Sequence, residues 1–123
     1  FSKPMGANLA HENKALNHLT EVITSQKLFL APDFSLAKMQ FHSNVSADTI
    51  RNAIKTSHFD NFKAFLNHHR ITHAVELIDG GYLNKHTINS LSIDAGFSAP
   101  QTFFRVFKEQ KKQTPVAYNT QNV

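Results

Sequence analysis

The stretch TINSLSIDAGFSAPQTFFRVFKEQKKQTPVAY, residues 87–118, decides how this chain folds. Its first part predicts a short helix, because three apolar residues fall on one helical face: Ile88, Leu91 and Ala95. Gly96 then supplies a residue that adopts positive φ without steric cost, which indicates a tight turn. Phe97 follows this turn, and we expect it to return to the core.

A second amphipathic helix is predicted from residue 100 to about residue 111, with Phe103 and Phe107 on its buried side. Thr114 and Pro115 predict the start of a third helix, since Thr is a good N-cap and Pro suits the first helical position. A helix, a glycine turn and a second helix with a polar outer face form a helix-turn-helix unit. The second helix of such a unit can lie in the major groove of DNA.

This C-terminal stretch resembles the signature of the AraC/XylS family of bacterial transcription regulators. The matching residues are Gly96, Phe97, Thr102, Phe103, Arg105, Phe107, Lys108, Thr114, Pro115 and Tyr118. The segment FKAFLNHHRITHAVELI is also similar to the linker helix of that family, at Asn67, Arg70, Ile71 and Ala74. The resemblance covers about residues 28–119 and implies a DNA-binding domain with two helix-turn-helix units.

The first half of the chain repeats the same layout. Ser35 is expected to cap a helix with an apolar side formed by Leu36, Met39 and, as a further candidate, Phe41. Asn44 predicts a turn, because Asn tolerates the left-handed conformation, and Ser46 is expected to cap a helix over residues 47–57. Residues 49, 50, 54 and 55 match residues 102, 103, 107 and 108 at one constant offset. This internal repeat predicts a first helix-turn-helix unit.

The expected fold is all-α, with about seven helices and two homeodomain-like helix-turn-helix subdomains joined by a long linker helix. We expect a disordered linker at 1–7, a first subdomain at 8–58, a linker helix at 59–79 and a second subdomain at 80–123. Asp79, Gly80 and Gly81 give the linker helix a strong stop signal. A helix of this length, roughly 25–30 Å, could hold two recognition helices in successive major grooves about 34 Å apart.

Eight residues are candidates for contacts with DNA bases, because they match the positions from which family members touch bases. Arg can bond guanine, Asn and Gln can bond adenine, and Asp can accept from cytosine. The alternative for the first helix is a solvated face with an ordinary Arg51–Asp48 pair. Phe104 can touch a thymine methyl group or pack on the linker helix. The candidates are Asp48, Thr49, Arg51, Asn52, Pro100, Gln101, Phe104 and Arg105.

Four lysines are candidates for phosphate contacts: Lys38, Lys55, Lys85 and Lys108. For Lys55 and Lys108 the alternative is a favourable charge at a helix C-terminus. The sequence departs from the family where Gly usually follows each recognition helix, since Phe59 and Lys112 stand there. These residues either adopt a strained left-handed conformation or belong to turns of another shape. Ala99 replaces a common capping Ser, and Ser98 is expected to cap instead.

Composition excludes several other classes of protein. Cysteine is absent, which excludes disulfides and thiolate metal sites, and no apolar run is long enough to span a bilayer. The net charge of +4 permits nucleic-acid binding without requiring it. His69 and His73 lie four residues apart with Glu76 nearby, but we expect a wet helix surface there and no metal or cofactor. No phosphate-binding loop, nucleophile elbow or carboxylate pair predicts an enzyme.

These features together predict a sequence-specific regulator of bacterial transcription that binds double-stranded DNA. The resemblance further implies RNA polymerase as a partner and a dimerisation or sensing domain outside this chain. We expect a cytoplasmic, nucleoid-associated domain that makes no membrane contact, in a protein that could be tethered to a membrane by another part. The alternative is a helical protein-interaction module that has kept the fold and lost sequence-specific DNA binding.

Overall fold

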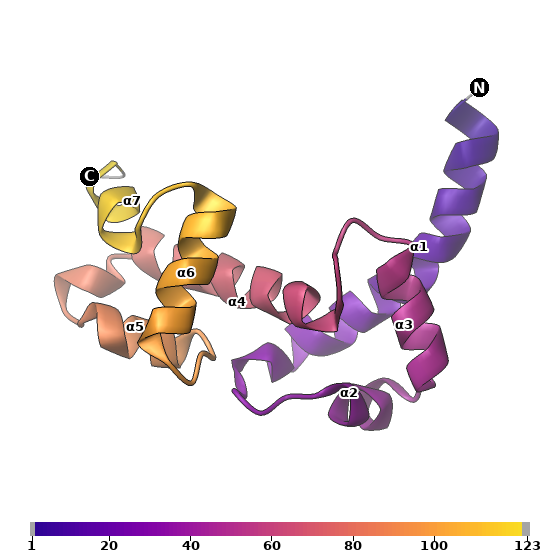
Figure 1. The fold of residues 1–123 in the computed structure, drawn as a ribbon, viewed down its shortest axis with the longest axis horizontal. Coiled ribbons are helices and arrows are strands. Elements are labelled where there is room, and N and C mark those ends of the chain that lie inside the picture. The colour runs from indigo at the N-terminus through magenta and orange to yellow at the C-terminus, as the bar shows by residue number, and fades with distance from the viewer. Residues whose placement is uncertain (1, 122–123) are drawn as a thin grey trace. The chain divides into compact units, whose positions relative to one another are not determined.

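The computed structural model describes the backbone of residues 2–121 and the side chains of residues 14–121. Within that range the chain is all-helical, with seven α-helices and no strand, so the predicted fold class is confirmed (Figure 1). The elements are α1 (Ser2–Ser25), η1 (Leu28–Leu30), α2 (Leu36–Ser43), α3 (Ala47–Lys55), α4 (Phe62–Asp79), η2 (Tyr82–Asn84), α5 (Ile88–Asp94), α6 (Pro100–Lys111) and α7 (Pro115–Gln121).

The chain divides into two compact units. The first consists of Phe1–Leu28 and Asp33–Phe65, and the second consists of Phe29–Pro32 and Leu66–Val123. The long helix α4 therefore contributes its first turn to one unit and the rest to the other. The predicted boundaries at 8–58, 59–79 and 80–123 stay a prediction, and the predicted linker at 1–7 lies outside the residues whose side chains are described.

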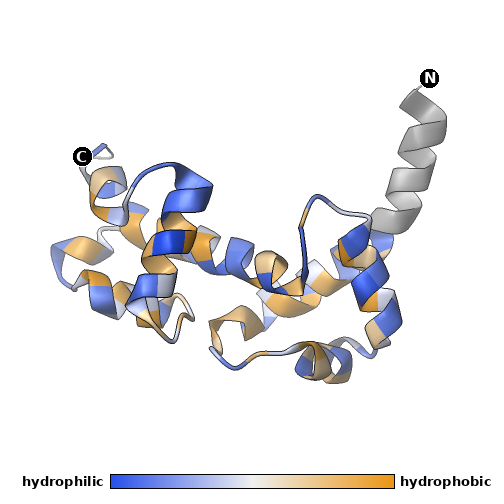
Figure 2. Cartoon of the chain, viewed as in Figure 1, coloured by the Kyte–Doolittle hydropathy of each residue, from blue (hydrophilic) through white to orange (hydrophobic). Residues whose placement is uncertain are grey.

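The first unit packs α1, α2 and α3 around a small apolar core. Leu19 and Ile23 of α1 are fully buried, and they share this core with residues of α2 and α3: Met39, Ile50 and Ile54. The caps expected at both helices are confirmed, because the Oγ atoms of Ser35 and Ser46 accept hydrogen bonds from backbone N–H groups. Figure 2 shows polar and apolar residues mixed along α2, α3 and the coloured part of α1.

The end of α2 and its exposed side were both predicted from the sequence, with different outcomes. Asn44 has φ of 59° and ends the helix in the left-handed conformation, as expected from its side chain. Phe41 was a candidate for the apolar side of α2, but that interpretation is wrong, because its side chain is 83% exposed. The core side of α2 is filled instead by Met39, with Ser43 donating its hydroxyl to the Met39 carbonyl.

The second unit has a core that gathers residues from α4, α5, α6 and the turn after α5. These residues are Ile71, Ala74, Ile78, Leu91, Ala95, Phe97, Phe103, Val106 and Phe107. Gly96 has φ of 95°, so the predicted glycine turn is confirmed. Thr114 caps α7, since its Oγ1 atom accepts from the Ala117 N–H group at 3.1 Å. The Tyr118 hydroxyl donates to Asp79 at 3.2 Å and ties α7 to the end of α4.

Candidate nucleic-acid interface

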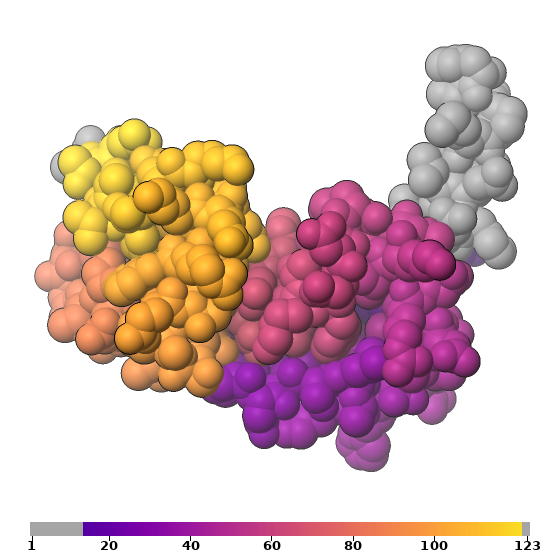
Figure 3. All heavy atoms as spheres, viewed as in Figure 1, coloured from indigo at the N-terminus to yellow at the C-terminus, as the bar shows by residue number. Residues whose placement is uncertain are grey.

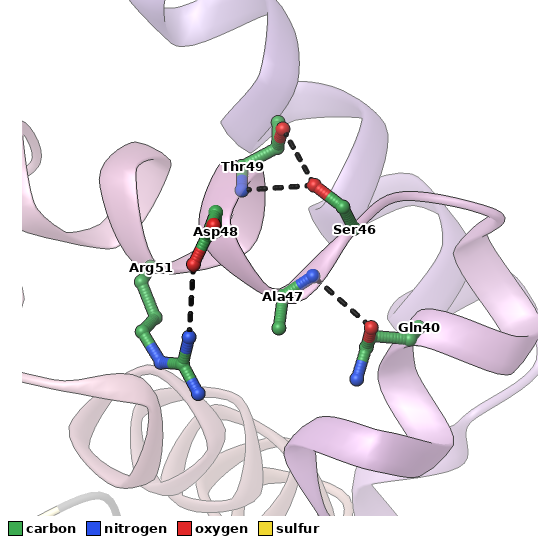
Figure 4. Close-up of polar contacts among 6 residues, drawn as sticks. All are labelled: Gln40, Ser46, Ala47, Asp48, Thr49 and Arg51. Carbon is green, nitrogen blue, oxygen red and sulfur yellow. Dashed lines mark hydrogen bonds and ion pairs between the residues drawn. The ribbon is translucent and has the colours of Figure 1, made fainter.

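The N-terminus of α3 is held by a local hydrogen-bond network. The Oγ atom of Ser46 accepts from the Thr49 N–H group at 3.2 Å and donates to the Thr49 hydroxyl at 2.9 Å. The Ala47 N–H group donates to Oε1 of Gln40 at 3.1 Å, which links α2 directly to the start of α3 (Figure 4). Because these donors would otherwise lack partners, the network fixes where α3 begins and how it leaves α2.

The outer face of α3 presents all four base-contact candidates of the first unit. The side chains on its other face, Ile50, Ala53 and Ile54, are buried, so the helix is strongly two-sided. Arg51 donates to the Asp48 carboxylate at 3.1 Å, while both side chains remain largely exposed (Figure 4). An exposed pair at this spacing contributes only about 0.3–0.5 kcal/mol, so DNA can displace it. The exposed candidates are Asp48, Thr49, Arg51 and Asn52.

The second recognition helix, α6, presents its candidates in the same way but begins differently. Gln101, Phe104 and Arg105 are exposed and Pro100 is half-buried, while Phe103, Val106 and Phe107 fill the core. Arg105 donates to Glu109 at 3.4 Å, one helical turn further on.

The N-cap position of α6 is Ala99, which makes no side-chain cap, so the prediction that Ser98 caps this helix is wrong. With Pro100 as its first residue, α6 has one fewer N–H group to satisfy, but the following N–H groups receive no capping side chain. The first turn of α6 is therefore more open to an incoming anion than the first turn of α3.

The four predicted phosphate-contact lysines are all exposed. Lys55 is the last residue of α3, and Lys108 lies in the last turn of α6. Lys38 pairs with Asp33 at 2.6 Å, and its hydrogen bond and charge lower the pKa of that carboxyl group. To contact DNA, Lys38 must therefore exchange this carboxylate for a phosphate. Lys85 follows the short helix η2.

The two turns after the recognition helices have different shapes. Lys112 ends α6 with φ of 63°, so a non-glycine residue does adopt the left-handed conformation there. Phe59 does not, because α3 ends at Thr56 with φ of −87° and ψ of 0°. The hydroxyl group of Thr56 donates to the carbonyl of Asn52 and stabilises this alternative ending. The turn after α3 therefore differs in shape from the left-handed turn usual in the family, whereas the turn after α6 keeps that conformation.

The histidines of α4 do not form a wet surface throughout. His69 is half-buried with its ring centroid 6.1 Å from that of Phe29, and burial followed by the charge of His68 lowers its pKa to about 4. His73 packs edge-on against the same Phe29 ring, 5.8 Å away. Among the described residues no group of His, Asp or Glu side chains is arranged to hold a metal ion.

Sequence reasoning did not identify Gln40, and it named Arg70 only as a match to the family's linker helix, without its bonds. Gln40 supports the start of α3, and a polar residue one turn before the left-handed Asn44 was a signal that could have identified it. Arg70 is 2% exposed and donates to the carbonyl groups of Phe29 and Ala31, at 2.7 and 3.0 Å. These bonds hold the segment Phe29–Pro32 against α4 within the second unit, and only the folded chain reveals them.

Comparisons with known proteins identify the family. A family model described as a helix-turn-helix domain matches residues 42–121, which is more than half of the chain. The crystal structure of the C-terminal domain of the two-component response regulator yesN from Fusobacterium nucleatum superposes with a TM-score of 0.68 at 18% identity. That alignment covers 86% of this chain and 98% of the other, and it shows a shared fold.

No curated protein matches the chain. None of the described helices is long and apolar enough to cross a membrane. The matched family model spans both recognition helices and the helix between them, and its members are regulators rather than enzymes. The chain therefore belongs to the AraC-type helix-turn-helix family of DNA-binding transcription regulators.

Proposed function

We propose that the chain binds duplex DNA sequence-specifically, with α3 and α6 each reading bases in the major groove. The observation that carries this proposal is the outer face of α3. Four polar side chains are exposed there on a helix whose other face is buried in its own unit. Such a helix can enter a groove about 12 Å wide without losing contacts that stabilise the fold.

Each exposed side chain has a specific partner chemistry. Arg51 and Arg105 can each bond the O6 and N7 atoms of guanine, and each must first release the carboxylate that it holds now. Asn52 and Gln101 can bond adenine, and Asp48 can accept from the N4 amine of cytosine. Thr49 already bonds Ser46, so we expect it to contact a base mainly through its methyl group.

Phosphate contacts set the register of the two helices on DNA. Lys55 and Lys108 occupy corresponding places near the ends of α3 and α6, and Lys38 and Lys85 lie on other exposed segments. The uncapped first turn of α6 adds backbone N–H groups and the positive end of the helix dipole. These contacts are independent of sequence and become weaker as the salt concentration rises.

RNA polymerase is the partner that we propose for the regulatory step, and a sensing or dimerisation domain elsewhere in the protein is the proposed source of control. Membership of a family of transcription regulators supports both proposals. The proposed place of action is the bacterial nucleoid in the cytoplasm, where the DNA lies.

The experiment is selection from a pool of random duplexes at two salt concentrations, followed by sequencing of the retained DNA. We expect two enriched blocks about 10 base pairs apart. Arg51→Ala and Arg105→Ala should each cost about 1–3 kcal/mol at the selected site and relax the preference for one base. Lys55→Ala should weaken binding to all sequences alike and reduce the salt slope by about one.

If both arginine variants bind the selected site as tightly as the parent, the base-contact assignment is wrong. A second candidate function is a helical protein-interaction module without sequence preference, which the exposed aromatic rings of Phe41 and Phe104 favour. That candidate predicts no enriched sequence and weak DNA binding that disappears at the higher salt concentration.

A further inference from the structure

A pocket of about 650 Å³ opens in the first unit between α3 and the segment 57–62 that leads into α4. Its wall includes apolar side chains from three parts of the chain, of which Ile50 and Ile54 belong to the buried face of α3. The others are Leu36, Phe59 and Phe62. Both the volume and this apolar lining are in the range of sites that bind small molecules.

The segment 57–62, which forms one side of the pocket, is stabilised by hydrogen bonds of its own. The Ser57 hydroxyl donates to the Ile54 carbonyl at 2.6 Å and accepts from the Phe59 N–H group at 3.0 Å. Oδ1 of Asn61 accepts from the Ala64 N–H group at 2.8 Å and caps the start of α4. The pocket is therefore formed before any ligand arrives, which lowers the entropy cost of binding.

The charges at the pocket are unequal. Lys55 and Arg51 line it from α3 and are exposed, and Asp60 is the single carboxylate among the lining residues. Arg51 already holds Asp48, whereas no ion pair of Lys55 is formed within residues 14–121. An exposed ammonium group at the side of an apolar pocket is complementary to an anion that carries an apolar body.

We propose that this pocket binds a small amphipathic organic anion, with a flat apolar body against the half-buried side chains of Leu36, Phe59 and Phe62 and a carboxylate or sulfonate group at Lys55. The body replaces water on apolar side chains, and the head forms a charge-assisted hydrogen bond. A neutral ligand of the same shape makes the same apolar contacts but forms no charge-assisted hydrogen bond with Lys55.

The ligand also controls DNA binding, an extension that rests on the proposed function. Lys55 is a proposed phosphate contact and Arg51 a proposed base contact, and both line the pocket. An anion bound at Lys55 therefore excludes the phosphate that this residue would contact. Ligand and DNA therefore compete for Lys55, and each weakens the apparent binding of the other.

The test uses two fluorescent dyes that share one aromatic body. 1-Anilinonaphthalene-8-sulfonate carries a sulfonate group, and N-phenyl-1-naphthylamine lacks it. Titrated into the full chain without DNA, both should bind saturably, with a Kd on the order of 10–100 μM for the sulfonate. Lys55→Ala should raise the Kd of the sulfonate about tenfold and leave that of the neutral dye unchanged. Lys111→Ala removes an exposed lysine of α6 outside the pocket and should change neither.

Each other outcome overturns part of the proposal. Absence of saturable binding by both dyes excludes the pocket as a ligand site. Equal binding of the sulfonate by the parent and by Lys55→Ala excludes the anion assignment. Because these titrations contain no DNA, they remain decisive even if the proposed base contacts fail. Dye that stays bound when a selected duplex is added excludes the competition and leaves the site itself intact.

Discussion

A Cβ atom placed on Gly96 would lie 3.1 Å from the Nε atom of Arg70 and 2.6 Å from the carbonyl oxygen of Phe29. The same Nε atom donates to that carbonyl at 2.7 Å, so the turn at Gly96 packs directly against the two groups that form this hydrogen bond. The Arg70 guanidinium also lies 5.7 Å from the centroid of the Phe97 ring. The turn at Gly96 and Phe97 therefore packs against Arg70 and against the segment Phe29–Pro32, all within the second unit.

Gly96→Ala is expected to destabilise the protein by at least about 2 kcal/mol, because it combines a positive φ with a clash against backbone. Gly80→Ala is the matched control. Its added Cβ would meet nothing closer than 3.4 Å, and its φ is not positive, so its effect should stay within about 0.5 kcal/mol. Urea denaturation followed by circular dichroism measures both. Equal stability of the two variants would show that the turn tolerates a side chain.

Lys112→Gly should stabilise the protein by about 0.5–1 kcal/mol, because Lys112 holds a left-handed conformation that glycine adopts without steric cost. The corresponding change in the first unit, Thr56→Gly, should destabilise it. Thr56 has negative φ and its hydroxyl bonds the Asn52 carbonyl, so glycine there only removes an interaction. Thermal melting of both variants tests this contrast. A gain at residue 56, or a loss at residue 112, would contradict it.

Phe104 is 40% exposed on the outer face of α6, and we expect its ring to contact a thymine methyl group. Replacing the contacted thymine by uracil should cost the parent about 0.8 kcal/mol, the contribution of one buried carbon. Phe104→Ala should show no such difference between thymine and uracil duplexes. The measurement is the affinity of each protein for each duplex, and equal sensitivity of the two proteins would mean that the ring does not touch the methyl group.

The stability of the protein is expected to depend on pH through His69. Its pKa is lowered from 6.5 to about 4 in the folded chain, so the unfolded chain takes up the proton first as the medium is acidified. Stability should fall as the pH decreases from about 6.5 to about 4, and His69→Leu should flatten that decline. Urea denaturation across this range compares the two proteins. Parallel declines would show that other groups cause the effect.

The local features of the chain could be predicted because neighbouring residues decide them. Ser35, Ser46 and Thr114 cap helices at the expected places. Asn44 and Gly96 form turns with positive φ, as expected because both residue types adopt positive φ at little energetic cost. The inner faces of α3 and α6 followed from helical periodicity, and the base-contact candidates on their outer faces followed from the resemblance to the AraC/XylS family. Which bases these faces contact stays a prediction.

The ends of the recognition helices were harder to predict, since residues of similar propensity compete there. Ser98 does not cap α6, because the helix begins one residue later at Pro100 with Ala99 as its N-cap. Phe59 avoids the left-handed conformation because α3 ends earlier, at Thr56. In both places the choice depends on how the turn packs, and one residue type could not decide it.

The sequence by itself determined the all-helical class, the order of the helices and the two helix-turn-helix units, because caps, turns and helical periodicity act over three or four residues. Only the tertiary structure decided that Arg70 bonds Phe29, that burial lowers the pKa of His69, that Phe41 is exposed and that a pocket opens beside Lys55. These features depend on how separate segments of the chain pack, which is decided only once the helices have come together.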